Sequence, residues 1–288
     1  MKLNQFISFS NLFVIVIICS FYFSFSLFCD AAVNYQLSIQ DPATNNLEWM
    51  ANFYDLIMAD LLLVLAVILF LIGTLLMDSS HHKDSNSYFS HSQNLEIFWT
   101  IVPALILLSI AYPSFNLLYS LDDLTDPVLT VKIIGHQWYW SYEFLDLDFQ
   151  AREFDAYMVP TEDLILGEFR LLTTDNQLTL PKSVPIKLLI TSADVLHCWA
   201  VPSFGVKVDA CPGRLNEASL YVKRSGLYFG QCSEICGVNH GFMPIMVKIN
   251  SVDEWVSKSL PESLPSSKLF LAKKSQTITR LQLKNLNF

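Results

Sequence analysis

Charged residues are scarce in this sequence. Asp, Glu, Lys and Arg make up only 16% of its 288 residues, whereas 52% are hydrophobic. A chain with so few charges and so many apolar residues is too hydrophobic to be a single soluble domain. Basic residues are the scarcer kind, with 18 Lys and Arg against 27 Asp and Glu and a net charge of −9 at pH 7. We expect no nucleic-acid partner, because affinity for nucleic acid depends on basic side chains.

Two long apolar runs account for this composition. Residues 56–77 contain a single charge, Asp60, and residues 95–119 carry only Glu96, near their start. Each run is long enough to cross a ~30 Å hydrocarbon core as a helix. We therefore predict a transmembrane hairpin within residues 31–121, with both of its ends on the same side of the membrane. Two buried helices of a large soluble protein are the alternative.

A third apolar run, residues 6–29, follows the single basic residue Lys2. It is longer than the usual ~7–15 residue apolar core of a signal peptide. A retained third span therefore stays open, and we favour a removable leader over residues 1–30.

The remainder of the chain, residues 122–257, alternates short apolar segments with Pro, Gly and Asp turns. No long amphipathic helix is expected, except after Asp253. This pattern is typical of a β-sandwich or barrel. The expected strands cover residues 128–134, 136–144, 178–180, 186–191, 218–222, 226–230 and 244–249.

Soft metal ligands gather in one loop of this domain. Cys232, Cys236, His240 and Met243 follow one another at spacings of four, four and three. Thiolate, imidazole and thioether groups favour copper or zinc over calcium or magnesium. Zinc loops usually pair their cysteines as C-x2-C or C-x4-C and recruit a second pair, whereas a thioether is a common weak ligand of copper. We predict copper, with a structural zinc loop or a disulfide as the alternative.

His197 supplies a further ligand, because it follows the apolar strand 186–191 at a position from which its side chain can reach the loop. A blue-copper site needs only one Cys, two His and a Met. The second thiolate therefore permits two copper ions bridged by sulfur. Shared ligation spreads the odd electron over both metals, so that electron transfer needs little rearrangement.

Three motifs together resemble subunit two of mitochondrial and bacterial cytochrome c oxidase, the family that carries the dinuclear CuA centre. They are IGHQWYWSYEF at 134–144, ADVLHCWAVP at 193–202 and GQCSEICGVNHGFMP at 230–244. The resemblance covers roughly Asn34 to Trp255. It implies an α+β membrane protein, a two-helix transmembrane hairpin followed by a cupredoxin-like β-sandwich domain at 122–257.

The resemblance also implies the roles of the loop residues. The two cysteines would bridge the coppers, each histidine would bind one, and Met243 and the backbone carbonyl of Glu234 would be weak outer ligands. The carboxylate of Glu234 would in addition reach a magnesium ion shared with the large subunit. The copper ligands implied are His197, Cys232, Glu234, Cys236, His240 and Met243.

Two further residues take roles from the resemblance. Trp138 would be where electrons enter from cytochrome c, whereas Trp140 is assigned to packing. Glu96 would lie at the mouth of a proton path into the large subunit. An ionisable residue in a membrane span is a functional candidate by default, although a glutamate at the interface can be simply solvated.

Acidic residues of the soluble part suggest a docking patch for basic cytochrome c, since complementary charge raises encounter rates. A generic solvated acidic surface is the alternative. The residues predicted for docking are Glu143, Asp146, Asp148, Asp175 and Asp194.

We identify no haem ligand and no dioxygen site in the chain, so we expect it to act only with other oxidase subunits. The function predicted is transfer of electrons from cytochrome c to haem in the large subunit, coupled to proton pumping. A quinol oxidase subunit should lack the copper ligands; a membrane-anchored copper carrier or structural protein is the remaining alternative.

Location follows from the predicted electron donor. The inter-span loop 78–94 has Lys83 as its only basic residue besides histidine, so loop charge does not orient the hairpin. The donor implies that the soluble domain lies outside the inner membrane. A bacterial origin stays open, but the segment SIQDPAT at 38–44 resembles mitochondrial chains, so we expect the mitochondrial inner membrane with the soluble domain in the intermembrane space. The basic extension at 258–288 and the thiols of Cys198 and Cys211 receive no role.

Overall fold

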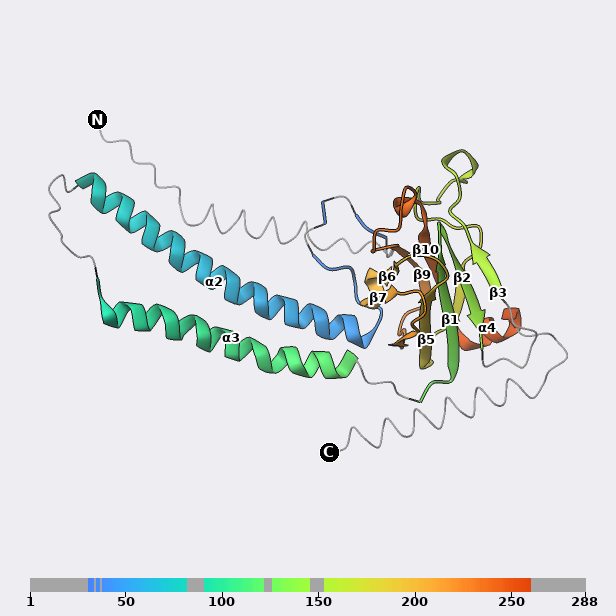
Figure 1. Cartoon of the computed structure of the whole chain (residues 1–288), viewed down its shortest axis with the longest axis horizontal. Coiled ribbons are helices and arrows are strands. Elements are labelled where there is room, and N and C mark those ends of the chain that lie inside the picture. The colour runs from blue at the N-terminus through green and yellow to red at the C-terminus, as the bar shows by residue number, and fades with distance from the viewer. Residues whose placement is uncertain are drawn as a thin grey trace, which may run out of the picture.

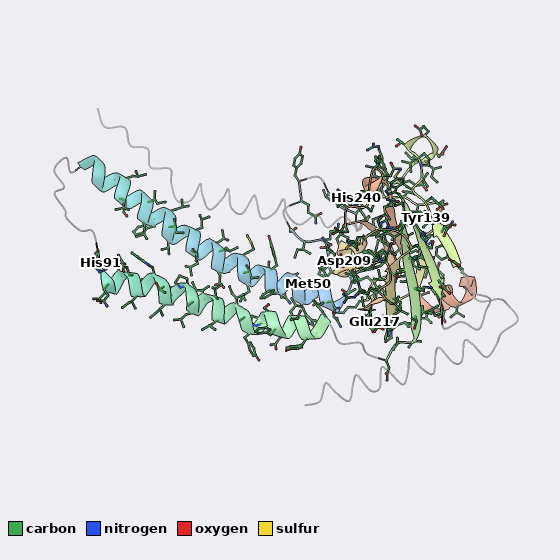
Figure 2. The ribbon with its side chains drawn as sticks, viewed as in Figure 1. Met50, His91, Tyr139, Asp209, Glu217 and His240 are labelled. Atoms are coloured by element: carbon green, nitrogen blue, oxygen red, sulfur yellow. The ribbon has the colours of Figure 1, made fainter. Side chains whose placement is uncertain are left out.

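The computed structural model describes residues 31–33, 35–36, 38–81, 91–121, 126–145 and 153–259. The predicted leader, residues 146–152 with the predicted docking residues Asp146 and Asp148, and the extension beyond residue 259 lie outside this part. Two long helices diverge from a β domain, close together beside it and further apart at their far ends (Figure 1). His91, just before the second helix, lies at the end of the hairpin remote from that domain (Figure 2).

The two helices confirm the predicted hairpin. Helix α2 covers Asn45–His81 and helix α3 covers Gln93–Leu121. Both are long and apolar enough to cross a membrane. Each extends beyond its apolar run, and α2 begins early because the Thr44 hydroxyl accepts the N–H of Leu47 at 3.2 Å as an N-cap.

The β domain contains ten strands within the described residues. One sheet has the order β3-β2-β1-β5-β8, a second has the order β4-β10-β9, and β6 and β7 form a separate ribbon. The strands are β1 Leu129–His136, β2 Tyr139–Phe144, β3 Glu153–Ala156, β4 Leu178–Pro181, β5 Ile186–Ser192, β6 His197–Val201, β7 Val206–Ala210, β8 Asn216–Leu220, β9 Gly226–Gln231 and β10 Pro244–Asn250. The short helices are η1 Thr161–Asp163, η2 Pro202–Phe204, η3 His240–Phe242 and α4 Val252–Ser259. The layers of strands confirm the predicted sandwich.

Alternating burial places the core between the sheets. Residues of β1 and β5 are buried at every second position, which is the pattern of strands with one face on a core. Trp140, Tyr228 and Trp255 are among the largest side chains that are fully buried there.

The strand predictions differ from the structure in two respects. The segment 136–144 is not one strand, because β1 ends at His136 and β2 starts at Tyr139, which leaves Gln137 and Trp138 in the turn. Strands β3, β6 and β7 are absent from the predicted set. All five residues of β6 are buried, so this strand shows no alternation of apolar and polar positions.

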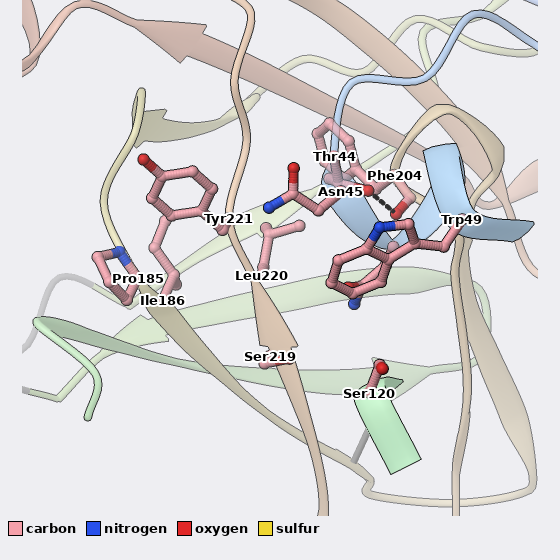
Figure 3. Close-up of a pocket in the computed structure, with 11 residues that line it drawn as sticks. Thr44, Asn45, Trp49, Ser120, Pro185, Ile186, Phe204, Ser219, Leu220 and Tyr221 are labelled. Atoms are coloured by element: carbon pink, nitrogen blue, oxygen red, sulfur yellow. Dashed lines mark hydrogen bonds between the residues drawn. The ribbon is translucent and has the colours of Figure 1, made fainter. Parts of the chain in front are cut away.

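The start of α2 is fastened to the sandwich. The N–H of Ala43 donates to the Ser203 carbonyl at 3.0 Å, and the N–H of Lys223 donates to the Ala43 carbonyl at 2.8 Å. The hydroxyl of Thr44 donates to the Phe204 carbonyl at 2.7 Å, beside a pocket between α2 and the sandwich (Figure 3). The hairpin therefore holds the β domain through backbone contacts as well as through the covalent chain.

Candidate metal centre

Segments far apart in sequence meet at one end of the sandwich. The loop after β9 carries Cys232 and Cys236, η3 and the residue that follows it carry His240 and Met243, and β6 begins with His197. The structure thus brings together all the side chains predicted as copper ligands.

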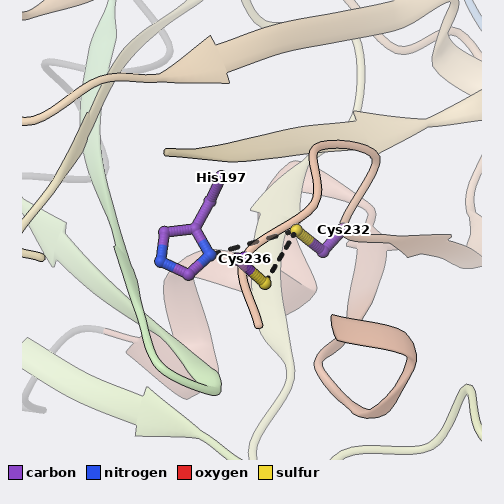
Figure 4. A group of neighbouring side chains, drawn as sticks. All are labelled: His197, Cys232 and Cys236. Atoms are coloured by element: carbon purple, nitrogen blue, oxygen red, sulfur yellow. Dashed lines mark hydrogen bonds between the residues drawn. The ribbon is translucent and has the colours of Figure 1, made fainter. Parts of the chain in front are cut away.

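The two cysteine sulfurs form the centre of the cluster. Their Sγ atoms lie 3.9 Å apart, and both cysteines are free thiols. His197 Nδ1 lies 4.0 Å from the sulfur of Cys232 (Figure 4), and His240 Nδ1 lies 3.5 Å from that of Cys236. One imidazole therefore stands beside each sulfur.

Two weaker donors complete the set. The sulfur of Met243 lies 3.5 Å from Cys236 Sγ, and the backbone carbonyl of Glu234 lies 3.3 Å from Cys232 Sγ. Met243 is only 1% exposed, so its thioether is held inside the site. The carboxylate of Glu234 makes no hydrogen bond or ion pair within the described part of the chain.

The ring of His197 is held in place from two sides. Its Nε2 lies 2.8 Å from Asp194 Oδ1, which leaves Nδ1 free to face the sulfurs. A Cβ on Gly135 of β1 would approach the His197 ring to 2.9 Å, so glycine provides the space that the ring fills. A carboxylate behind a histidine fixes its tautomer and orientation in metal sites.

The Asp194 carboxylate is itself anchored. Its Oδ2 accepts the N–H of Gln137 at 2.6 Å, and its Oδ1 accepts the N–H of Val195 at 2.6 Å. Burial acts to raise the pKa of Asp194, but hydrogen bonds from His197, Val195 and Gln137 outweigh it and hold the pKa below its usual value. The carboxylate is therefore ionised at neutral pH.

The two thiols differ in acidity. Burial acts to raise the pKa of Cys232, but hydrogen bonds from His197, the backbone of Cys198 and Glu234, and His240 lower it to about 7. Burial and the neighbouring Cys232 raise the pKa of Cys236 to about 12. The site therefore holds one thiolate readily at neutral pH, and a bound cation would favour loss of the second proton.

These donors fit a pair of soft metal ions. A metal at ~2.3 Å from a thiolate can touch both Cys232 and Cys236 only from a point beside the line that joins their sulfurs, because that line measures 3.9 Å. Such a point exists on either side of the line. The separate imidazoles of His197 and His240 give each position its own nitrogen donor.

Trp138 lies against the loop that carries Cys232 and Cys236. Its Nε1 donates to the Cys236 carbonyl at 3.3 Å, and Gln137 Nε2 donates to the same oxygen at 2.8 Å. Gly237 packs on the Trp138 ring, since a Cβ there would approach it to 3.1 Å. Trp138 is half-buried and lines a surface depression together with Tyr157, Met158, Asn239 and Phe242.

Trp140 has a different environment. It is fully buried, its Nε1 donates to the Met243 carbonyl at 3.3 Å, and its ring meets that of His197 edge to face. It packs the floor of the site, as predicted.

The described residues among those predicted for docking make separate contacts. Glu143 is paired with Lys132 at 2.9 Å on the β1–β2 ladder. Asp175 accepts the N–H groups of Tyr157 and Asn176, both at 2.7 Å. Asp194 supports His197, as described above, and Asp146 and Asp148 lie outside the described residues.

Glu96 belongs to the first turn of α3, at the far end of the hairpin, where its Oε1 lies 2.8 Å from His91 Nδ1.

The other thiols of the described residues take no part in the cluster. Cys198 is buried, which raises the pKa of its thiol to about 12. Its carbonyl accepts the N–H of Ser233 at 3.1 Å, which ties β6 to the ligand loop.

The sequence predicts the ligands but not their supports. It places Asp194 in the docking patch and gives Gln137 and Gly135 no role. The spacing of Asp194 three residues before His197 is the available signal, since a carboxylate beside a metal-binding histidine is a recurrent arrangement.

Comparisons with known proteins agree along most of the chain. Residues 129–250 match the family model described as cytochrome c oxidase subunit II, periplasmic domain, and residues 32–117 match its transmembrane domain. Cytochrome c oxidase subunit 2 of Cyanidium caldarium is 47% identical over 243 residues, which cover 82% of this chain and 95% of that protein.

The corresponding protein of Arabidopsis thaliana is 48% identical over 240 residues, which cover 81% of this chain and 92% of that protein. Among solved structures, the periplasmic domain of subunit II of cytochrome oxidase of Bradyrhizobium japonicum is 42% identical. It matches with a TM-score of 0.43 and covers 47% of this chain and 94% of that one.

Proposed function

The chain belongs to the cytochrome c oxidase subunit II family, and from this premise we propose that its β-sandwich holds a dinuclear copper centre. This centre would receive electrons from cytochrome c and pass them to haem in the large subunit. As a member of the family, the chain is an oxidase subunit and works within a complex. The observation that carries the proposal is the pair of free sulfurs, 3.9 Å apart, with one imidazole beside each.

The ligands would be His197, Cys232, the Glu234 carbonyl, Cys236, His240 and Met243. When bound, the copper pair would supply a one-electron centre whose change of charge is shared between both metals. The protein contributes rigidity, because Asp194 holds the ring of His197 and Gln137 holds the Cys236 carbonyl. Ligands that are fixed in advance move little when the charge of the centre changes.

Electrons would enter through Trp138. Its indole lines the surface depression and reaches the backbone of a copper ligand through one hydrogen bond, to the Cys236 carbonyl. An electron donor that covers the depression would therefore contact Trp138. From there, the path to the centre is short and includes the hydrogen bond to the Cys236 carbonyl.

Basic cytochrome c would dock around this depression. Asp175 is bonded to the N–H of Tyr157, which lines the depression, and Asp194 is bonded to the N–H next to Trp138. Backbone N–H donors carry no net charge, so Asp175 keeps its negative charge. Glu143 contributes less, because Lys132 neutralises it. We expect the rate of cytochrome c oxidation to fall with ionic strength and with Asp175→Asn; a rate that changes with neither would contradict this docking.

Two roles concern the partner subunit. The carboxylate of Glu234 is available to a magnesium ion shared with the large subunit, since no other described residue binds it. Glu96 would open a proton path, and its place at the end of the hairpin opposite the copper site suits uptake from the other side of the membrane. The copper domain would face the intermembrane space of mitochondria.

The test uses the purified oxidase complex. We expect two coppers in the subunit and an electron spin resonance spectrum in which the unpaired electron couples equally to two copper nuclei. Cys236→Ser should abolish this equal coupling, and Cys198→Ser is the matched control that should preserve it. A single copper per subunit, or zinc with no colour, would contradict the proposal.

A further inference from the structure

Asp60 is the only charge in the apolar stretch of α2. It lies four residues inside the stretch that starts at Leu56, or ~6 Å along a helix that rises ~1.5 Å per residue. No residue of the described part of the chain forms a hydrogen bond or ion pair with Asp60. An ionisable side chain at such a depth is expensive unless it faces protein or water.

Asp60 shares the face of α2 that is turned toward α3. The half-buried positions Phe53, Ile57 and Asp60 recur at spacings of four and three, which place them on one helix face. One turn before Asp60, Leu56 lines a groove between the two helices, opposite Pro113. Asp60 therefore continues the wall of this groove toward the membrane interior.

Beyond Asp60 the two helices separate. Residues 61–72 of α2 and 97–105 of α3 are exposed on every side of their helices. Figure 1 shows the two ribbons close together near the sandwich and diverging toward their far ends. Asp60 thus stands at the narrow end of a wedge between two apolar helices.

A second hydrogen-bond acceptor lies at the same depth. Pro113 has no N–H, so the carbonyl of Ser109, four residues earlier in α3, lacks its helical donor. The helices are antiparallel, and Leu56 lies opposite Pro113. Asp60 comes one turn after Leu56, and Ser109 comes one turn before Pro113. Asp60 and Ser109 therefore lie at similar depths.

We propose that Asp60 binds a Lys or Arg side chain from a membrane helix of another oxidase subunit, which fills the wedge between α2 and α3. A basic side chain carries several N–H donors, so it can pair with the carboxylate and donate to the Ser109 carbonyl together. The opposite charge compensates Asp60 inside the bilayer. A lipid amine is a poorer occupant, since it would have to leave the headgroup region to reach this depth.

Carboxyl labelling tests the contact in the intact complex. Dicyclohexylcarbodiimide enters membranes and reacts with protonated carboxyl groups there. We expect Asp60 to be protected within the complex and to become labelled, by mass spectrometry, after the subunits are dissociated in detergent with the native lipids retained. Equal labelling in both states would overturn the proposal, and so would protection that persists after dissociation, since a lipid would then be the occupant.

Substitutions provide the second measurement. Asp60→Leu leaves the partner's cation unpaired in hydrocarbon, and we expect the amount of assembled complex to fall about tenfold or more. Asp60→Asn, which keeps the shape and one acceptor oxygen, should lower it less. Asp55→Asn is the matched control, an exposed acid at the membrane boundary of the same helix, and should assemble normally.

Assembly of Asp60→Leu at the wild-type level would refute the contact. The copper spectrum of the same samples tests the proposed function independently of the contact, because Asp60 lies outside the sandwich. Loss of assembly with the copper spectrum intact supports the contact, and an altered copper spectrum without loss of assembly counts against it.

Discussion

Replacing Asp194 by Asn distinguishes a residue that positions a metal ligand from one that only attracts a redox partner. In the structure Asp194 uses one oxygen for His197 Nε2, at 2.8 Å, and the other for the N–H of Gln137, at 2.6 Å. Asparagine has the same shape but only one acceptor oxygen. It therefore cannot serve both donors, and the amide group has to face one of them.

The size of the effect follows from the role of the carboxylate. Groups that orient a metal-binding histidine typically contribute about 10- to 100-fold in metal affinity, equivalent to roughly 1.4 to 2.7 kcal/mol. We expect Asp194→Asn to lower copper affinity within this range. The measurement is retention of copper by the purified complex against a chelator, with the electron spin resonance spectrum followed in parallel.

Asp175→Asn is the control for charge. It removes one negative charge near Trp138 but touches no copper ligand, so it should weaken the salt dependence of cytochrome c oxidation and leave copper affinity unchanged. If Asp194→Asn behaves in the same way, with copper affinity within about threefold of wild type, Asp194 does not position His197. The inference that a carboxylate behind the imidazole supports the metal ligand would then fail.

Three further predictions concern single residues. Gly135→Ala should displace the ring of His197, because the new Cβ would meet it at 2.9 Å; we expect ~1–3 kcal/mol lower stability from overpacking, measured by thermal unfolding, together with weaker copper binding. In the metal-free chain, the rate of iodoacetamide alkylation of Cys232 should rise with pH and be half-maximal near its pKa of about 7, because the thiolate is the nucleophile. Cys198, with a pKa of about 12, should stay unreactive. Glu96→Gln should slow oxidase turnover without a change in copper content, and equal turnover would remove Glu96 from the proton path.

The sequence predicted the features that depend on local spacing. The hairpin was predictable because an apolar run of sufficient length can be recognised without tertiary structure. The loop ligands were predictable because Cys232, Cys236, His240 and Met243 lie within one short segment. His197 required one further step, its place after an apolar strand.

The features that depend on long-range packing were not predictable in this way. The turn at Gln137 and Trp138 contains no Gly, Pro, Asn or Asp to mark it, and the β-pattern on both sides reads as one strand. The role of Gly135 depends on a ring that arrives from β6, and the role of Asp194 depends on the backbone of that turn. Such contacts exist only once the strands are in register.

The attachment of α2 to the sandwich connects the predicted hairpin with the long-range packing around His197. Gly205 adopts a left-handed conformation with φ of 67° and lies against Leu47, where a Cβ would approach to 3.1 Å. The carbonyl of its neighbour Phe204 accepts the hydrogen bond from the Thr44 hydroxyl. Phe204 is the last residue of the short helix η2, which directly follows β6, the strand that begins at His197. Strand β6 is thus connected, within a few residues, to the N-cap of α2. The position of His197 relative to the start of α2 is therefore set by backbone contacts rather than by a flexible linker, which would suit the proposed transfer of electrons to a fixed site in another subunit.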